Sequence, residues 1–307
     1  MKVANIKDTE IVTDDHPTGA LGFHYLLQGE TGSPENFIML VAENLGRFDM
    51  VRHRHNFDQF RFCISGDMEM GGGRRLKEGH LGYFPEGAPY GPQADDSGRI
   101  AMVIQFGGAS GYGYMSPRQY RDGRESLSRT GSFEGPVYIR EKDGKKTFSI
   151  NAIWEETMGA KMLIPAPRYD APIFMNPEAY RWVPVMGRSG VLRKTLGTFS
   201  EREVKAEIWS LRSAASYEFI AGDATRLLFA LEGHGKAGAQ ALETHGAVQL
   251  DPGESTEIHG EPELTLLSFT FPPVNQDWLE AGLPSFEPVP GESVEGEARD
   301  WETDDAA

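Results

Sequence analysis

Short strand-like segments, most of them apolar, recur along the first third of the chain, and residues that favour tight turns separate them. The segments cover residues 23–27, 37–42, 50–55, 60–65, 81–84 and 100–106. They are bounded by Gly, Pro, Asn or Asp, which supply the backbone conformations that turns require. Short segments at regular spacing are typical of a β-sandwich or β-barrel rather than of alternating strands and helices. The pattern therefore predicts an all-β unit.

A second series of apolar segments lies in the last third of the chain. It covers residues 207–211, 216–220, 227–231, 248–250 and 264–271. This series has the same short segments and turn residues, so it predicts a second all-β unit of similar size. The length of 307 residues suits two domains of about 100–150 residues each.

The residues between the two series have a different composition. Residues 107–114 are rich in Gly and Tyr, which suits either a lid over a site or a plain connection, the simpler of the two. Ser116 followed by Pro117 is typical of a helix N-terminus and predicts a short polar helix to about Ser128. Residues 152–158 predict one or two further helical turns. The region thus predicts a connection with short helices.

Charge changes the picture at the end of the chain. The net charge is −16, and residues 287–307 contain eight acidic residues and a single base, Arg299. A segment of this composition cannot build a core, which predicts a flexible acidic tail over residues 281–307. An acidic protein repels phosphate backbones, so we expect no nucleic-acid partner.

Cysteine count and hydropathy exclude further classes of protein. Cys63 is the single cysteine, so the chain cannot form an internal disulfide. No apolar run approaches the roughly 20 residues that a membrane helix needs, and the N-terminus does not resemble a secretion signal. These features predict a cytoplasmic protein that does not act at a membrane and whose partner is a small molecule.

The first candidate chemistry lies in residues 49–66, which read DMVRHRHNFDQFRFCISG. His53 and His55 are two residues apart, so on a strand both side chains point to the same face. Gln59 follows after three intervening residues. Two imidazoles on one strand with a third donor nearby form a geometry that holds a divalent transition metal. We therefore predict His53, His55 and Gln59 as metal ligands.

A second motif lies in residues 79–93, which read GHLGYFPEGAPYGPQ. Gly79 is followed by five residues, Pro85, one residue, Gly87, two residues and Tyr90. Together the two stretches resemble the paired motifs of the cupin superfamily, in which His-x-His and Glu are followed by Gly, and Gly-x5-Pro-x-Gly precedes a further His. The resemblance implies a double-stranded β-helix, or jelly-roll barrel, with a metal site.

Three positions depart from the cupin pattern. Gln59 stands where the family has its Glu ligand, and Tyr90 stands where the family has its last His. Gly46 precedes His53 by one residue more than is usual. A neutral amide binds a metal more weakly than a carboxylate, while Tyr90 either coordinates as phenolate or donates a hydrogen bond. The alternative is a metal-free barrel in which these side chains bind a polar ligand directly.

The second half of the chain repeats part of the same frame. Gly246 and Pro252 match the spacing of Gly79 and Pro85. The same frame places Arg226 at the Glu position and residues 217–219, which contain no histidine, at the His-x-His position. The resemblance therefore implies a two-barrel cupin, or bicupin, whose second barrel lacks a metal motif and serves a structural role.

These features predict four regions. Residues 1–110 form an N-terminal cupin barrel with the metal site, and residues 111–170 form the connection. Residues 171–280 form a C-terminal cupin-like barrel, and residues 281–307 form the tail. Because cupins commonly associate through their sheets, the resemblance also implies a possible homodimer.

Alternation along the strand adds two side chains to the predicted site. If Gln59 faces the lumen, Arg61 and Cys63 do too. A guanidinium there suits a carboxylate, which it binds in bidentate fashion, or else it pairs with an Asp or Glu of the barrel wall. Cys63 lacks an activating motif and is expected to be a buried apolar residue. Arg61 and Tyr90 are thus the candidate catalytic residues.

The resemblance leaves three functions open. The first is a metal-dependent enzyme, with dioxygenase-like oxidation of a small carboxylated or phenolic substrate as the leading version. Its metal would be Fe(II) in preference to Mn, Ni or Zn, with Arg61 binding the substrate and Tyr90 orienting it. The second is a metal-dependent isomerase, epimerase or lyase on a sugar-derived or carboxylated substrate. The third is a non-catalytic small-molecule binding protein.

Overall fold

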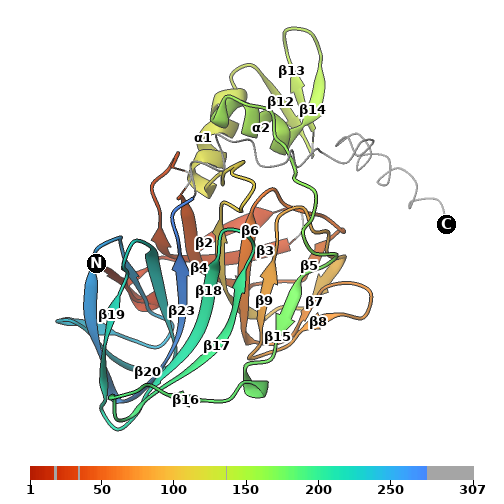
Figure 1. The fold of residues 1–307 in the computed structure, drawn as a ribbon. Helices are drawn as coiled ribbons and strands as arrows, with labels where there is room; N and C mark the ends of the chain where they lie inside the picture. Colours follow the sequence, from red (N-terminus) through yellow and green to blue (C-terminus); the bar gives the residue numbers. More distant parts are fainter. Residues whose placement is uncertain (17–18, 34, 136, 275–307) are drawn as a thin grey trace.

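The computed structural model describes residues 1–274 except 17–18, 34 and 136 (Figure 1). Antiparallel strands dominate, and they form two large sheets and three smaller ones. The described helices are short, and none of them is long and apolar enough to cross a membrane. The predicted acidic tail, residues 281–307, lies outside the described residues.

The first large sheet carries most of the strands predicted in the first third of the chain. Its strand order is β15-β9-β6-β11-β4-β3-β2. The strands are β2 (Val12–His16), β3 (Gly19–Gln28), β4 (Phe37–Asn44), β6 (Asp58–Ser65), β9 (Leu81–Phe84), β11 (Ile100–Phe106) and β15 (Ile173–Met175). Two small ladders accompany this sheet: β5 (Phe48–Met50) with β10 (Gln93–Asp95), and β7 (Met68–Glu69) with β8 (Arg75–Leu76).

The second large sheet repeats this arrangement. Its main path is β1-β22-β20-β23-β18-β17-β16, with β19 paired to β23 and β21 paired to β20. The strands are β1 (Lys2–Ala4), β16 (Val183–Pro184), β17 (Val191–Phe199), β18 (Val204–Leu211), β19 (Ser216–Ile220), β20 (Thr225–Ala237), β21 (Gln240–Leu242), β22 (Ala247–Leu250) and β23 (Ser255–Phe271). Strands β6 and β20 hold the same place in the two sheets, which is the arrangement expected of a duplicated barrel.

The edge strands cross the predicted domain boundaries. Strand β1 pairs with β22, with Val3 opposite Val248, so the N-terminus belongs to the second sheet. Strand β15 pairs with β9, with Phe174 opposite Gly82, so it belongs to the first sheet. Each half thus covers an edge that the other would leave unpaired, and unpaired edges promote aggregation. Neither large sheet is therefore built from one contiguous stretch of the chain, and the predicted domain bounds of 1–110 and 171–280 stay a prediction.

The two sheets pack face to face over a shared aromatic core. Phe60 on β6 is fully buried, and its ring centroid lies 5.3 Å from that of Phe199 and 4.8 Å from that of Phe269. Side chains alternate along β6, so this packing turns Gln59 and Arg61 to the opposite face. The inter-barrel core therefore fixes which residues of β6 enter the lumen of the first barrel.

The connection forms a small unit at one end of the molecule (Figure 1). The predicted helix is confirmed as α1 (Pro117–Leu127), which begins with a capping box of Ser116 and Gln119. The second predicted helix is α2 (Ser149–Met158), three residues longer at its start than expected. The sequence analysis missed a three-stranded sheet of β12 (Gly131–Glu134), β13 (Val137–Arg140) and β14 (Lys146–Phe148), because these strands are short and mostly polar.

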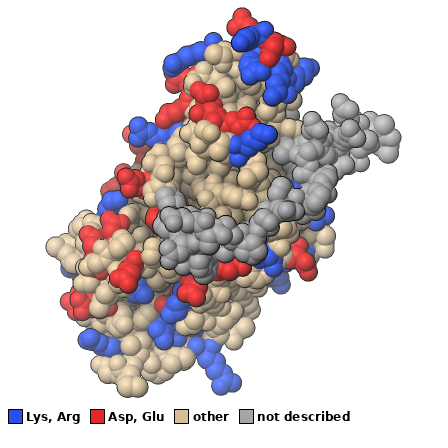
Figure 2. All heavy atoms as spheres, turned by 45° about the horizontal axis from the view of Figure 1, so that its top comes forward, with Lys and Arg blue, Asp and Glu red and all other residues tan. Residues whose placement is uncertain are grey.

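Two 3-10 turns complete the described chain, η1 (Ile6–Asp8) and η2 (Pro177–Ala179). On the side turned forward in Figure 2, the surface is hollowed between the connecting unit and the barrels. Uncharged residues form most of the visible floor of this hollow, whereas charged side chains gather around it.

Candidate functional site

The segment that carries the two histidines is not the strand that the sequence predicted. Strand β5 ends at Met50, and the segment that follows has a single bridge, in which His53 N donates to Tyr90 O at 3.0 Å and Tyr90 N donates to His53 O at 2.9 Å. The facing chain turns at Gly91, whose φ of 103° excludes most side chains. The turn limits the ladder to one bridge, yet the rings of His53 and His55 still meet, with centroids 5.0 Å apart.

Both imidazoles are half-buried and neutral at pH 7. Burial lowers the pKa of His53 to about 4, with a smaller contribution from the charge of Arg61. Burial also lowers the pKa of His55, and the neighbouring His53 and Arg61 lower it further. His53 Nδ1 lies 2.8 Å from Val51 O, and because a carbonyl only accepts, Nδ1 carries the proton of this ring.

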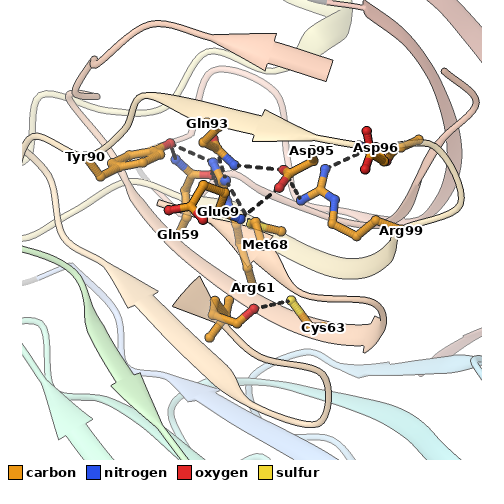
Figure 3. Close-up of polar contacts among 12 residues, drawn as sticks. Gln59, Arg61, Cys63, Met68, Glu69, Tyr90, Gln93, Asp95, Asp96 and Arg99 are labelled. Atoms are coloured by element: carbon orange, nitrogen blue, oxygen red, sulfur yellow. Dashed lines mark hydrogen bonds and ion pairs between the residues drawn. The ribbon is translucent and has the colours of Figure 1, made fainter. Parts of the chain in front are cut away.

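Arg61 reaches into the lumen from β6, as the alternation predicts (Figure 3). Its Nη2 donates to Tyr90 Oη at 2.6 Å and to Gln59 Oε1 at 3.0 Å. Its guanidinium carbon lies 4.6 Å from the centroid of the Phe84 ring, a cation–π contact. Nη1 makes only a long contact, 3.5 Å, to Gln93 Oε1, and another at 3.6 Å to the sulfur of Met68.

All the hydrogen-bond acceptors that Arg61 reaches among the described residues are neutral. The sequence left open whether Arg61 pairs with a carboxylate of the barrel wall, and within the described part of the chain no such pair is present. Asp95 is linked to Arg61 only through Gln93, whose Nε2 donates to Asp95 Oδ2 at 3.5 Å. That carboxylate pairs with Arg99 at 3.5 Å instead. The charge of Arg61 is therefore solvated by an amide and a phenol but not neutralised by an ion pair.

Three polar side chains of the site form hydrogen bonds with Tyr90 Oη. It accepts hydrogen bonds from Arg61 and, at 3.3 Å, from Gln59 Nε2. These two donors occupy its lone pairs, which leaves its own proton for His55 Nε2 at 2.9 Å. Burial raises the pKa of Tyr90 above its ordinary value although Arg61 and Gln59 act in the opposite direction. The phenol therefore remains protonated and holds His55 through Nε2.

The polar network continues to two residues that the sequence analysis missed. Gln105 on β11 stands opposite Gln59, and its Nε2 donates to Gln59 Oε1 at 3.4 Å. Tyr114 Oη donates to Gln105 Oε1 at 3.0 Å and its ring packs 5.2 Å from that of Phe57. A lone polar residue in the apolar strand β11 was the available signal for Gln105. For Tyr114, the sequence offered only its place in the Gly/Tyr-rich segment.

A second polar cluster lies beneath the site and contains buried carboxylates. Glu86 accepts hydrogen bonds from Ser110 N at 2.8 Å and Ser110 Oγ at 2.6 Å, and pairs with Arg168 at 2.7 Å. Asp58 accepts from Glu86 N at 2.7 Å. Burial, followed by the charge of Asp58, raises the pKa of Glu86 to about 7. These bonds anchor residues 107–114, which favours a fixed connection over a lid.

Cys63 faces the lumen but takes no part in the network. Its side chain is fully buried, and its Sγ donates to Leu76 O at 3.4 Å. Burial raises the pKa of this thiol to about 12, so the nucleophilic thiolate is scarce at pH 7. The structural role expected for Cys63 agrees with this environment.

The chemistry of these donors does not fit a resident divalent metal. His55 Nε2 accepts the proton of Tyr90, and both Gln59 Oε1 and Tyr90 Oη accept from Arg61. Over the described chain, no three His, Cys, Asp or Glu side chains are grouped so that they could hold an ion. A dication is stabilised by anionic or free neutral donors, and here a guanidinium occupies them. In this arrangement His53, His55 and Gln59 do not form the ligand set that the sequence predicts, and metal binding by them stays an untested prediction.

The lumen of the second barrel has a different content. Rings of Trp209 and Tyr217 lie 4.7 Å apart, and the Tyr217 and Phe219 rings lie 5.0 Å apart, with Phe219 fully buried. Arg226, at the Glu position of the frame, donates to Thr270 Oγ1 at 3.4 Å and packs over Phe219. Aromatic side chains thus fill the place that the histidines occupy in the first barrel.

Comparisons with known proteins support the fold. No family model matches the chain, and no curated protein matches it in sequence. Among solved structures it is similar to a proposed dioxygenase from Nostoc punctiforme, with a TM-score of 0.56 and 9% identity over 88% of this chain and 82% of that one. It is also similar to HEPD from Streptomyces albus with 2-hydroxyethylphosphonate and Fe(II) bound, with a TM-score of 0.55 and 11% identity over 92% and 79%.

A third similar structure is the oxalate decarboxylase of Bacillus subtilis, with a TM-score of 0.51 and 12% identity over 92% of this chain and 82% of that one. Identities this low carry information on the fold and not on the reaction. They agree with the repeated strand order of the two sheets and with the paired motifs around His53 and Pro85. The chain is therefore a cupin by fold, built from two barrels.

Proposed function

We propose that the N-terminal barrel binds a small organic carboxylate, with Arg61 as the residue that recognises the acid. The observation that carries this proposal is the guanidinium itself, which lies partly buried in the lumen and reaches only neutral acceptors among the described residues. A cation withdrawn from water without a counter-charge is costly, and a bound anion offsets that cost. A carboxylate also matches the planar donor geometry of arginine.

The surroundings of Arg61 support a fixed recognition group. Gln59 and Tyr90 hold Nη2, and the Phe84 ring packs against the guanidinium plane, so little side-chain freedom is lost on binding. Nη1, with its long contacts to Gln93 and Met68, is the nitrogen with donor capacity to spare. A carboxylate that binds there would exchange weak neutral contacts for a charge-assisted hydrogen bond.

The half-buried rings beside Arg61 favour an acid that also carries an aromatic or apolar part. His55 and Phe57 lie with ring centroids 4.5 Å apart and planes inclined by 33°. Both keep part of their surface exposed, as Arg61 does, whereas Gln59 and Tyr90 are buried. Flat, partly accessible rings next to an arginine suit a planar acid. Of the similar structures, one is named for oxalate and another is described with 2-hydroxyethylphosphonate as substrate, and both compounds are small anions.

Metal-dependent, dioxygenase-like oxidation is the second candidate. Because the proton of the His53 ring is on Nδ1, Nε2 has a lone pair with which it could bind a metal. One similar structure, HEPD, is described with Fe(II) bound. If a metal binds, His53 and His55 would hold it and it would supply Lewis-acid or redox chemistry. Tyr90 and Arg61 would first have to release His55 and Gln59. A redox-inactive metal such as zinc would favour the isomerase or lyase version.

Calorimetric titration with three probes tests the carboxylate proposal. We expect benzoate to bind more tightly than acetate, and phenol to bind weakly because it lacks the charge. Replacing Arg61 by Met keeps the length of the side chain and removes the charge, so R61M should bind benzoate at least about tenfold more weakly, the effect of losing one charge-assisted hydrogen bond. The matched control is R129M, since Arg129 is an exposed arginine of the connecting unit.

Equal benzoate affinity in the wild-type protein and R61M would overturn the proposal. Elemental analysis of the same preparation, purified without added metal, addresses the second candidate. Near-stoichiometric iron, manganese or nickel that is lost in a His53→Ala/His55→Ala variant would favour metal-dependent oxidation over carboxylate binding by Arg61 alone. Stoichiometric zinc would direct the search to isomerase or lyase assays.

A further inference from the structure

We infer that Arg61 is the cation of this barrel: its guanidinium, matched by the neutral Gln59, takes the place that a metal holds in cupins and excludes a divalent ion. The inference goes beyond carboxylate binding, because it concerns what the site rejects and does not depend on which anion it accepts. It also predicts that changes at two positions convert the barrel to a metal site.

The oxygens of Gln59 and Tyr90 converge on one cation, Arg61. Two of the three positions that depart from the cupin pattern, 59 and 90, present an oxygen to the same nitrogen, Arg61 Nη2. Arg61 Nε adds a second contact to Gln59 Oε1 at 3.3 Å. The atoms that would face a metal thus accept hydrogen bonds from a guanidinium. An ion that bound the same oxygens would lie within a few ångströms of a like charge, an arrangement that Coulomb repulsion opposes.

A neutral amide at position 59, where cupins have a glutamate, is the side chain that suits a neighbouring arginine whose charge is to be kept. A glutamate there would form an ion pair with Arg61 and neutralise the lumen. The amide accepts from Arg61 through Oε1 and donates to Tyr90 through Nε2, which a carboxylate cannot do. Gln59 therefore fixes the guanidinium, keeps the charge of the lumen positive and directs the proton of Tyr90 to His55.

Arg61 is also held in place by contacts on several sides of its guanidinium. Phe84 and Tyr90 rings lie 4.6 and 5.1 Å from its guanidinium carbon. Gln93 and Met68 contact Nη1 from the small ladders that close the lumen. Gln93 is itself linked to Asp95, which pairs with Arg99 (Figure 3). Rotation of Arg61 away from Gln59 would break these contacts together, so an incoming ion cannot displace the side chain cheaply.

Zinc affinity, measured by competition with a chromophoric chelator, tests the inference in four proteins. These are the wild type, R61M, the double variant Q59E/R61M, and the double variant with His53→Ala and His55→Ala added. The double variant removes the repelling charge, frees Tyr90 and supplies an anionic ligand beside the two imidazoles. We expect Q59E/R61M to bind zinc at least about a hundredfold more tightly than the wild type, and the histidine replacements to abolish the gain. Cobalt in place of zinc should give the visible absorption of a histidine-ligated ion only in Q59E/R61M.

Two results would overturn the inference. One is a wild-type protein that binds zinc stoichiometrically and as tightly as Q59E/R61M. The other is a Q59E/R61M protein that is folded by circular dichroism and binds zinc no more tightly than the wild type. If the double variant does not fold, R61M alone decides: we expect about tenfold tighter zinc binding than in the wild type, and unchanged affinity would contradict the inference. Benzoate binding by the wild type is measured separately, so failure of the carboxylate proposal is distinguishable.

Discussion

The two barrels share a strand order and differ in what fills them. On β6 the lumen-facing series Gln59, Arg61 and Cys63 begins with two polar residues in one hydrogen-bonded network. At the same place in the second sheet, β20 presents Arg226, which packs over Phe219, and then Leu228 and Ala230, which belong to a buried apolar cluster. One architecture therefore supports both a partly accessible polar site and a lumen that is filled mainly by aromatic and apolar side chains, with Arg226 packed over Phe219.

The difference shows that the fold supplies positions while side chains decide their use. In the second barrel, Phe219 and its ring neighbours exclude water and contribute stability through burial. In the first barrel, the corresponding part of the lumen contains polar side chains such as Arg61 and Tyr90, whose burial costs free energy. Binding sites are commonly built at the expense of stability, and the comparison predicts where each barrel is sensitive.

The largest effect is expected from emptying the second lumen. Phe219→Ala removes a fully buried ring that packs on Trp209 and Tyr217, which should lower the free energy of unfolding by about 3–5 kcal/mol. Benzoate affinity of the folded variant should not change. The matched replacement in the first lumen, Phe57→Ala, affects a half-buried ring and should do the reverse, with a smaller loss of stability and weaker benzoate binding. Urea unfolding and calorimetry measure both quantities; equal stability losses would contradict the comparison.

An intermediate effect on stability is expected from titration of the buried carboxylate of Glu86. The pKa of Glu86 in the folded protein is about 7, above its ordinary 4.5. The folded state thus holds this proton more tightly than the unfolded state, so the contribution to stability is full below pH 4.5 and is lost as the pH rises through 7. The linked change is on the order of 3 kcal/mol.

Glu86→Gln tests this linkage because an amide cannot titrate. As the pH rises from 4.5 to 7.5, the stability of the variant should increase relative to that of the wild type. This holds whatever the stability difference between the two proteins is at any single pH. Glu201→Gln removes the half-exposed carboxylate that pairs with the same Arg168 and serves as the control, with a much smaller change in slope. Denaturant midpoints across this pH range supply the measurement. A stability difference independent of pH would show that Glu86 does not titrate there.

The smallest effect is expected from the hydroxyl of Tyr90. Tyr90→Phe keeps the ring and removes the bond to Arg61 and the bond to His55. Loss of these bonds should weaken benzoate binding by a few-fold, equivalent to about 0.5–1.5 kcal/mol, because Arg61 is still held by Gln59 and Phe84. Calorimetry on the variant checks this value. A loss as large as that in R61M would move the main recognition role from Arg61 to Tyr90.

The sequence predicted the architecture well because motif spacing and turn residues are local features. The paired motifs around His53 and Pro85 indicated the cupin barrel, and the Ser116–Pro117 pair indicated the start of α1. The exchange of β1 and β15 between sheets was not predictable, since short strands acquire their partners only through tertiary packing. The same limit explains why β12–β14 were missed.

The sequence indicated which side chains lie together in the candidate site, but it did not indicate the hydrogen bonds that join them. Alternation correctly placed Arg61 beside Gln59, and the bridge to Tyr90 brings both histidines to the lumen although their segment is not a strand. Whether Arg61 meets a carboxylate depends on residues distant in sequence, such as Gln93 on β10, and spacing does not reveal such contacts. The role of Gln105 required the register between β6 and β11.

The most direct test of the central claim is benzoate titration of the wild-type protein with and without excess EDTA. A site organised around a guanidinium binds through Arg61 and needs no ion, so the account predicts the same affinity in both titrations. Loss of binding in EDTA, with recovery on addition of iron or zinc, would show that a metal ion is the cation of this barrel and would contradict the account.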